Sequence, residues 1–134
     1  MHFVRYEIRR ETKRTFYEGG DSLEYIPFNS LEGARVYIAT HPEEMKASEG
    51  ETLTLCKVLL YPSYDVPEVI TIFDQEGREW IQAKYDALKS IEYLLNMEQT
   101  QAELKVVRAV IIPKIAKRYG LIRECRKRGY LPKR

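Results

Sequence analysis

The sequence predicts an α+β fold, with a small, largely antiparallel β-sheet of about four strands and helices packed on one face. Two observations predict it. Residues 1–78 contain the two-residue apolar spacing and the β-branched runs of strands, whereas residues 79–134 change to the apolar spacing of helices. A length of 134 residues is typical of one domain. We therefore expect a single domain over residues 1–134, β-rich with one helix at first and helical afterwards.

The first strand is predicted at residues 3–9, where apolar side chains alternate with Arg and Glu. A polar turn follows, and a short second strand is expected at residues 15–17. The twin glycines Gly19 and Gly20 close it, because glycine tolerates the positive φ of a sharp turn. The two strands would form an N-terminal hairpin, and strand 3–9, as an unpaired edge strand, could mediate dimerisation.

The first helix is predicted to begin at Asn29, which can cap it. Glu32, three positions later, could complete a capping box by accepting a hydrogen bond from the Asn29 amide. His41 and Pro42 end the helix, because a residue that precedes proline avoids the α region. The polar and acidic residues 43–51 that follow are expected to form an exposed loop.

The central strand is predicted at residues 52–60, which are apolar or β-branched on both alternating sets apart from one lysine. Such a strand is expected to be covered on both faces of the sheet. Residues 69–73 predict another strand, followed by a turn at residues 74–77.

The helical half begins with a helix predicted from about residue 79 to 97, with a break near residues 96–100. Pro113 is expected either to kink the next helix or to occupy the first turn of a new one. Gly120 is well placed to end that helix in the left-handed conformation, and residues 121–128 predict one last short helix.

The two cysteines are far apart in sequence and in unlike surroundings, Cys56 in an apolar run and Cys125 among Lys and Arg. We expect both to be reduced and unpaired. No apolar run approaches the roughly 18 residues of a membrane span, and the first ten residues lack the apolar core of a signal peptide. The sequence therefore predicts a cytoplasmic protein.

The charge is strongly asymmetric along the chain, although the formal net charge is only +2. Residues 114–134 carry a net +8 and residues 1–113 a net −6. A separation of this size attracts an anionic partner to one end of the molecule. The nine basic residues are Lys114, Lys117, Arg118, Arg123, Arg126, Lys127, Arg128, Lys133 and Arg134.

Nucleic acid or a nucleoprotein assembly is the partner that this basic segment favours, because phosphate binding needs Lys and Arg within reach of a backbone. Tyr119 and Tyr130 could stack on unpaired bases. Arg9, Arg10 and Arg14 from the predicted hairpin could add to the surface. The alternative partner is an acidic surface of a larger enzyme, to which the protein would bind as an inhibitor or adaptor. A plain solubility tail is the third interpretation.

The segment around Gly120 resembles the first helix and turn of a helix-turn-helix DNA-binding unit. Ala116 lies four positions before this glycine, and Leu121 follows it with the apolar side chain of that family. The family then places apolar residues about six and nine positions after the glycine, where this chain has Arg126 and Gly129. The resemblance covers about a dozen residues.

A second resemblance involves Phe28, Ser30, Ala34 and Tyr37, followed by the strand at residues 53–60. These residues are similar to the aromatic-Ser-Ala-Tyr helix and following strand of ADP-ribosyltransferase-type domains. The resemblance covers about a quarter of the chain, and it would imply an enzyme that binds NAD.

That resemblance would give Arg5 the role of seating NAD, and Glu76 or Glu79 the role of the transfer carboxylate, but neither lies in a family motif. Elsewhere the residues typical of catalysis are sparse. His2 is at the N-terminus, and His41 has no nearby Ser, Cys or Asp in a recognised spacing. We therefore expect a non-enzymatic binding module with no cofactor or metal. A small accessory protein of a bacterial virus would fit this size and lack of catalytic motifs.

Overall fold

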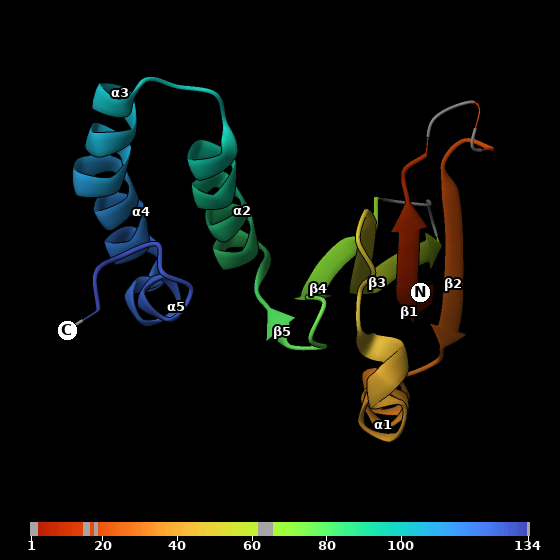
Figure 1. Ribbon diagram of the computed structural model, residues 1–134. Helices are drawn as coiled ribbons and strands as arrows, with labels where there is room; N and C mark the ends of the chain where they lie inside the picture. Colours follow the sequence, from red (N-terminus) through yellow and green to blue (C-terminus); the bar gives the residue numbers. More distant parts are fainter. Residues whose placement is uncertain (1–2, 15–16, 18, 62–65, 134) are drawn as a thin grey trace. The chain divides into compact units, whose positions relative to one another are not determined.

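A computed structural model describes residues 3–14, 17, 19–61 and 66–133 of the chain. Two compact units follow one another, Met1–Gln82 and Ala83–Arg134. We call them the sheet unit and the helical unit and describe each by itself. The single domain expected over residues 1–134 stays a prediction. Figure 1 draws the sheet unit in red to green and the helical unit in green to blue.

The sheet unit contains five strands in the order β2-β1-β3-β4-β5, and every neighbouring pair is antiparallel. The expected antiparallel sheet within an α+β fold is therefore confirmed, with five strands in place of about four. The strands are β1 (Phe3–Thr12), β2 (Ser22–Phe28), β3 (Glu51–Tyr61), β4 (Glu68–Phe73) and β5 (Glu79–Trp80).

The second strand lies further along the chain than predicted. Residues 15 and 16 are outside the described residues and Tyr17 lies in a helical turn, whereas β2 begins at Ser22. Pro27, the next-to-last residue of β2, makes the segment look unlike a strand. Proline is tolerated here because β2 is the first strand of the sheet, where an amide donor is not needed on the outer side. The expectation that strand 3–9 lies at an edge was wrong, since β1 lies between β2 and β3.

The first helix, α1 (Leu31–Thr40), begins one residue later than predicted. Ser30, not Asn29, is its N-cap, and the Ser30 hydroxyl accepts a hydrogen bond of 3.0 Å from the Gly33 amide. Its end at His41 is confirmed.

The segment after α1 is not the simple exposed loop that the sequence predicted. A 3₁₀ turn over Pro42–Met45 brings Met45 and Ala47 into the core, where they are 3% and 5% exposed. The core of the sheet unit consists of Ile8, Ala34, Met45, Ala47, Leu53, Leu55 and Phe73.

The strand β3 is buried on both faces, as predicted. Leu53 and Leu55 belong to one alternating set and Cys56 and Val58 to the other, and all four are at most 2% exposed. Both thiols are free, so the expectation of unpaired cysteines is confirmed.

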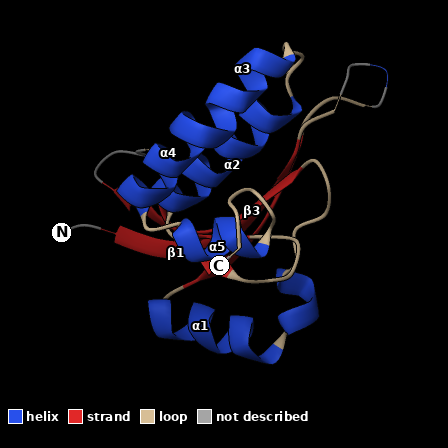
Figure 2. Cartoon of the chain, turned by 60° about the vertical axis from the view of Figure 1, so that its left-hand side comes forward, coloured by secondary structure: helices blue, strands red, loops and turns tan. Residues whose placement is uncertain are grey.

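The helical unit consists of α2 (Gln82–Asn96), α3 (Gln101–Val106), a π-helical turn (Val107–Ile111), α4 (Ile112–Tyr119) and α5 (Ile122–Lys127). Figure 1 and Figure 2 both show α2 running beside the continuous rod of α3, the π turn and α4. The predicted break between the long helices is confirmed. Thr100 follows it as the N-cap of α3, and its hydroxyl accepts from the Glu103 amide at 3.2 Å.

Pro113 lies in the first turn of α4, one of the two positions expected for it. The π turn precedes it directly, and the Ile112 amide bonds to the Val107 carbonyl five residues back. Gly120 ends α4 with a φ of 69°, as predicted, and the Leu121 amide then bonds to the Ala116 carbonyl at 2.8 Å. The last short helix is also confirmed.

Candidate nucleic-acid interface

The basic residues of α4 share one helix face. Lys114, Lys117 and Arg118 are three and four positions apart, which places their side chains together on the surface of a helix. All three are exposed. Ile112 and Ala116 occupy the opposite face and are fully buried. The apolar face therefore holds the helix against the unit and directs the cations to water.

The next helix repeats this arrangement. Arg123, Arg126 and Lys127 have the same three- and four-residue spacing on α5. Arg123 and Lys127 are exposed, and Arg126 is half-buried. Leu121 and Cys125, which are 1% and 0% exposed, hold this short helix in place. Two consecutive helices thus each present three cations.

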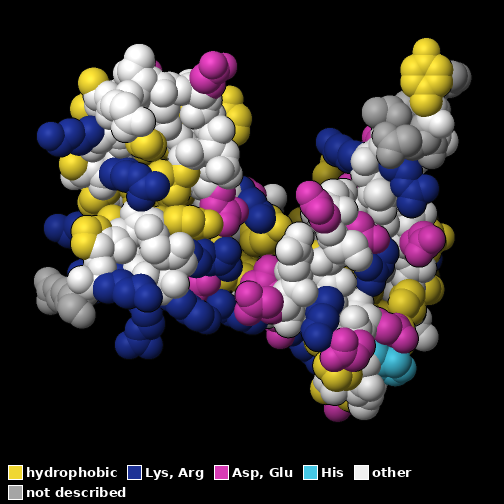
Figure 3. All heavy atoms as spheres, in the orientation of Figure 1, with side chains coloured by type: hydrophobic (Ala, Val, Ile, Leu, Met, Phe, Trp, Pro, Cys, Tyr) yellow, Lys and Arg dark blue, Asp and Glu magenta, His cyan; other side chains and the backbone are white. Residues whose placement is uncertain are grey.

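These six side chains are not neutralised by the protein's own carboxylates. Within the described ranges, none of them takes part in an ion pair. The helical unit contains thirteen Lys and Arg but only five Asp and Glu, so it carries a net +8. Figure 3 shows dark blue Lys and Arg side chains gathered over its lower part, where α4 ends and α5 follows. We call Lys114, Lys117, Arg118, Arg123, Arg126 and Lys127 the basic face.

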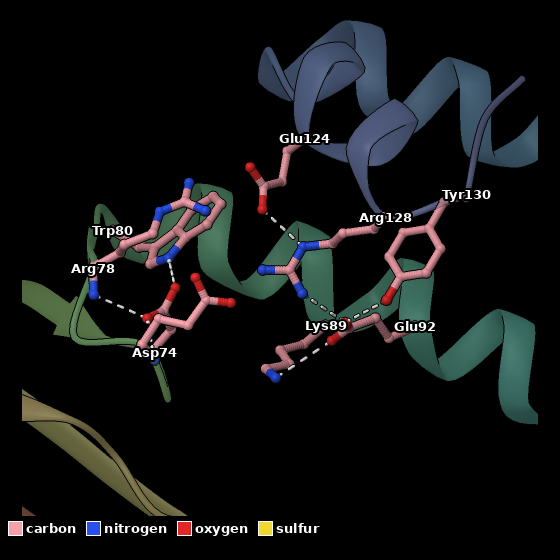
Figure 4. Close-up of polar contacts among 9 residues, drawn as sticks. Asp74, Arg78, Trp80, Lys89, Glu92, Glu124, Arg128 and Tyr130 are labelled. Carbon is pink, nitrogen blue, oxygen red and sulfur yellow. Dashed lines mark hydrogen bonds and ion pairs between the residues drawn. The ribbon is translucent and has the colours of Figure 1, made fainter. Parts of the chain in front are cut away.

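Two residues of the predicted set have a different role. The Tyr130 hydroxyl donates a hydrogen bond of 2.6 Å to Oε2 of Glu92 on α2. Arg128 donates from Nη1 to the same oxygen at 3.3 Å and from Nε to Oε1 of Glu124 at 2.8 Å. Lys89 lies 3.3 Å from the other oxygen of Glu92 (Figure 4). These contacts fasten the segment after α5 to α2.

The ionisation of both side chains reflects these contacts. Burial is the largest single effect and lowers the pKa of Arg128, but the contacts with Glu124, Tyr130 and Glu92 together outweigh it, so the pKa is raised overall. Burial and the hydrogen bond to Glu92 both raise the pKa of Tyr130. Arg128 therefore stays charged and Tyr130 stays a donor, each engaged with a carboxylate of the same unit.

The remaining predicted residues lie at the C-terminus. Lys133 is exposed, and Arg134 is outside the described residues. Tyr119, the other tyrosine of the predicted set, is half-buried at the end of α4. The Arg118 guanidinium lies over its ring, 5.5 Å from the centroid.

A groove between α2 and α4 lies next to the basic face and has a volume of about 480 Å³. Lys114, Arg118 and Tyr119 line it from α4, and small or polar residues line it from α2. Among the latter are Asp86 and Ser90, both exposed. Sequence reasoning missed this groove, because nothing in the spacing of α2 indicates that α4 lies beside it.

The arginines of the N-terminal hairpin are mostly engaged within the sheet unit. Arg9 lies 2.6 Å from Glu7, and Arg10 lies 2.7 Å from Glu51. Of the three hairpin arginines expected to add to the anion-binding surface, only Arg14 is exposed.

Of the two candidate transfer carboxylates, Glu79 pairs with Arg35, whereas Glu76 is exposed. Asp74, in the turn between them and β4, accepts the Arg78 amide with one oxygen at 2.9 Å and the Trp80 indole with the other at 2.8 Å (Figure 4). Among the described residues, no group of three His, Cys, Asp or Glu is placed to hold a metal ion.

The remaining candidates for catalysis have structural partners. The ring of His41 stacks on Tyr37 with centroids 4.0 Å apart. Arg5, the residue that the ADP-ribosyltransferase resemblance would use, is 2.6 Å from the buried carboxylate of Glu7. Burial raises the pKa of Cys56 and of Cys125, so both thiols stay protonated at neutral pH.

Comparison of the chain with protein-family models, curated proteins and solved structures finds no match. None of the helices in the described ranges has the length and apolar character needed to cross a membrane.

Proposed function

We propose that the helical unit binds nucleic acid through the basic face of α4 and α5. The observation that carries the proposal is that two consecutive helices each present three cations, none of them paired with a carboxylate in the described structure. Cations without an internal ion pair are available to phosphates, and each phosphate they neutralise releases counterions from the nucleic acid, which favours binding.

A polyanion fits this surface better than a protein partner does. Protein interfaces are centred on exposed apolar or aromatic anchors. Among the described residues, no large hydrophobic side chain of α4 or α5 is exposed, and the exposed ones of this unit lie at Tyr93, Met97, Val106 and Val110. The basic face thus offers charge without an apolar centre, as surfaces that follow a phosphate backbone do.

The proposal makes a quantitative statement about salt. Each neutralised phosphate contributes about −0.9 to the slope of log K against log salt for a duplex, and about −0.7 for a single strand. Full use of six cations gives a slope of about −5 or −4, respectively. Binding through an apolar protein interface would show little dependence on salt.

The decisive measurement is fluorescence anisotropy of labelled DNA and RNA oligomers at several salt concentrations. The double variant Arg123→Ala/Lys127→Ala removes two exposed cations of the basic face and should lower the magnitude of the slope by about 2. The matched control is Lys13→Ala/Lys57→Ala, which removes two exposed cations of the sheet unit and the same net charge.

The control should bind as the natural protein does, because its lost charges lie outside the basic face. Equal weakening by both double variants would show that only net charge matters, and the assignment to α4 and α5 would be wrong. If neither DNA nor RNA binds at low salt, nucleic acid is not the ligand. An acidic protein surface would then be the better proposal.

A further inference from the structure

We infer that the groove between α2 and α4 holds one unpaired nucleotide, so that the protein prefers single strands to duplexes. This inference rests on the proposed function and adds the class of nucleic acid. The groove is part of the helical unit alone, and two of its lining residues, Lys114 and Arg118, belong to the basic face. A strand that follows the basic face therefore passes the mouth of the groove.

The size of the groove suits one nucleotide. Its volume of about 480 Å³ lies in the range of roughly 300–1,000 Å³ that small-ligand sites occupy. The space exists because α2 contributes Ala83, Ala87 and Ser90 at successive helical turns, and none of these side chains is large. A base inside a duplex is stacked and paired on every side and cannot enter such a groove, whereas an unpaired base can.

The α4 wall provides both interactions that an unpaired nucleotide requires. Lys114 and Arg118 are four residues apart, on the same helix face, and provide positive charge for a phosphate. Tyr119 provides an aromatic ring, and the Arg118 guanidinium already lies over that ring at 5.5 Å. Bases stack on both kinds of planar group, so the pair forms a ready stacking surface.

The α2 wall adds a selective element. The side chain of Asp86 is exposed in the groove and forms no ion pair among the described residues, even though the groove contains two cations. A carboxylate only accepts hydrogen bonds, so it favours bases that present an amino group, such as cytosine. Thymine presents two carbonyl groups around its single N–H and would be repelled. The groove should therefore prefer dC to dT.

The test compares three probes by anisotropy, namely a dC strand, a dT strand and a duplex, each about 12 units long. Ser90→Leu fills the groove from an exposed position, and Ser90→Ala is its control. Ser90→Leu should weaken binding of the dC strand roughly tenfold, the value of one stacked base, and leave the duplex unchanged. Tyr119→Ala should act in the same way, while Tyr119→Phe keeps the stacking surface. Thermal unfolding by circular dichroism verifies that each variant is folded.

The outcomes separate the inference from the proposed function. Failure of all three probes at low salt overturns the inference, and failure of the RNA oligomers as well overturns the proposed function. Binding of duplex and single strand with equal affinity, together with unchanged binding by Ser90→Leu and Tyr119→Ala, overturns the inference and leaves the basic face as a general phosphate surface. Asp86→Asn should abolish the preference for dC over dT, because an amide also donates hydrogen bonds. A preference that persists in Asp86→Asn would refute the role of Asp86.

Discussion

The hydrogen bond between Tyr130 and Glu92 is expected to fasten the C-terminal segment, and its removal should lower the stability of the protein. Tyr130→Phe keeps the ring and deletes only the donor, which lies 2.6 Å from Oε2 of Glu92. Hydrogen bonds to charged groups contribute about 1.5–3 kcal/mol. Glu92 keeps Arg128 and Lys89 as partners, so the carboxylate is not left unsatisfied. We expect the lower end of that range, about 1.5 kcal/mol.

A double-mutant cycle with Glu92→Gln isolates the pair. Urea unfolding followed by circular dichroism at 222 nm gives the free energy of unfolding for the natural protein, both single variants and the double variant. Because the charge of the acceptor is lost in Glu92→Gln, Tyr130→Phe should cost about 1 kcal/mol less in that background. An equal cost in both backgrounds would refute the assigned hydrogen bond. Tyr130→Phe should also leave the salt slope of nucleic-acid binding unchanged.

Three further predictions concern other parts of the molecule. The Ser48 amide, outweighing burial, holds the pKa of Glu51 below its ordinary 4.5. Its stabilisation is thus present above that pH and lost as the pH falls through the folded-state pKa, and a pH series of urea unfolding should show less acid sensitivity for Glu51→Gln. Gly120→Ala forces a φ of 69° on a side chain and should destabilise by about 1 kcal/mol in the same assay. Arg128→Ala should cost about 1.5 kcal/mol of stability and leave the salt slope unchanged. Lys127→Ala should leave the stability unchanged and lower the magnitude of the salt slope by about 1.

Features that depend on a few neighbouring residues could be predicted from the sequence. The strand β3 follows from its continuous β-branched and apolar run, and the end of α4 follows from a glycine placed after a helical pattern. The i, i+3 and i+4 spacing of the cations in 114–127 is also local information. This spacing places three cations on one side of each helix as soon as the helices form.

Other features depend on residues distant in sequence. β2 was not recognised because Pro27 is compatible with a strand only at the edge of a sheet, and the strand order is a property of the whole unit. Asn29 and Ser30 are both good caps, and only the backbone path places the Ser30 hydroxyl on the Gly33 amide. Burial of Met45 likewise requires the surface of the sheet against which it packs.

The sequence by itself determined that the C-terminal end is strongly basic and helical, because charge and helical periodicity depend only on residues close together in the chain. Only the tertiary structure decided which cations remain available. Lys127 and Arg128 are neighbours in the chain, yet Arg128 meets Glu92 across 36 residues and Lys127 has no ion pair among the described residues. The groove beside α4 is decided in the same way, since its walls come from helices that pair only in the folded unit. Local patterns determine the elements, whereas long-range contacts decide which side chains are engaged and which face water.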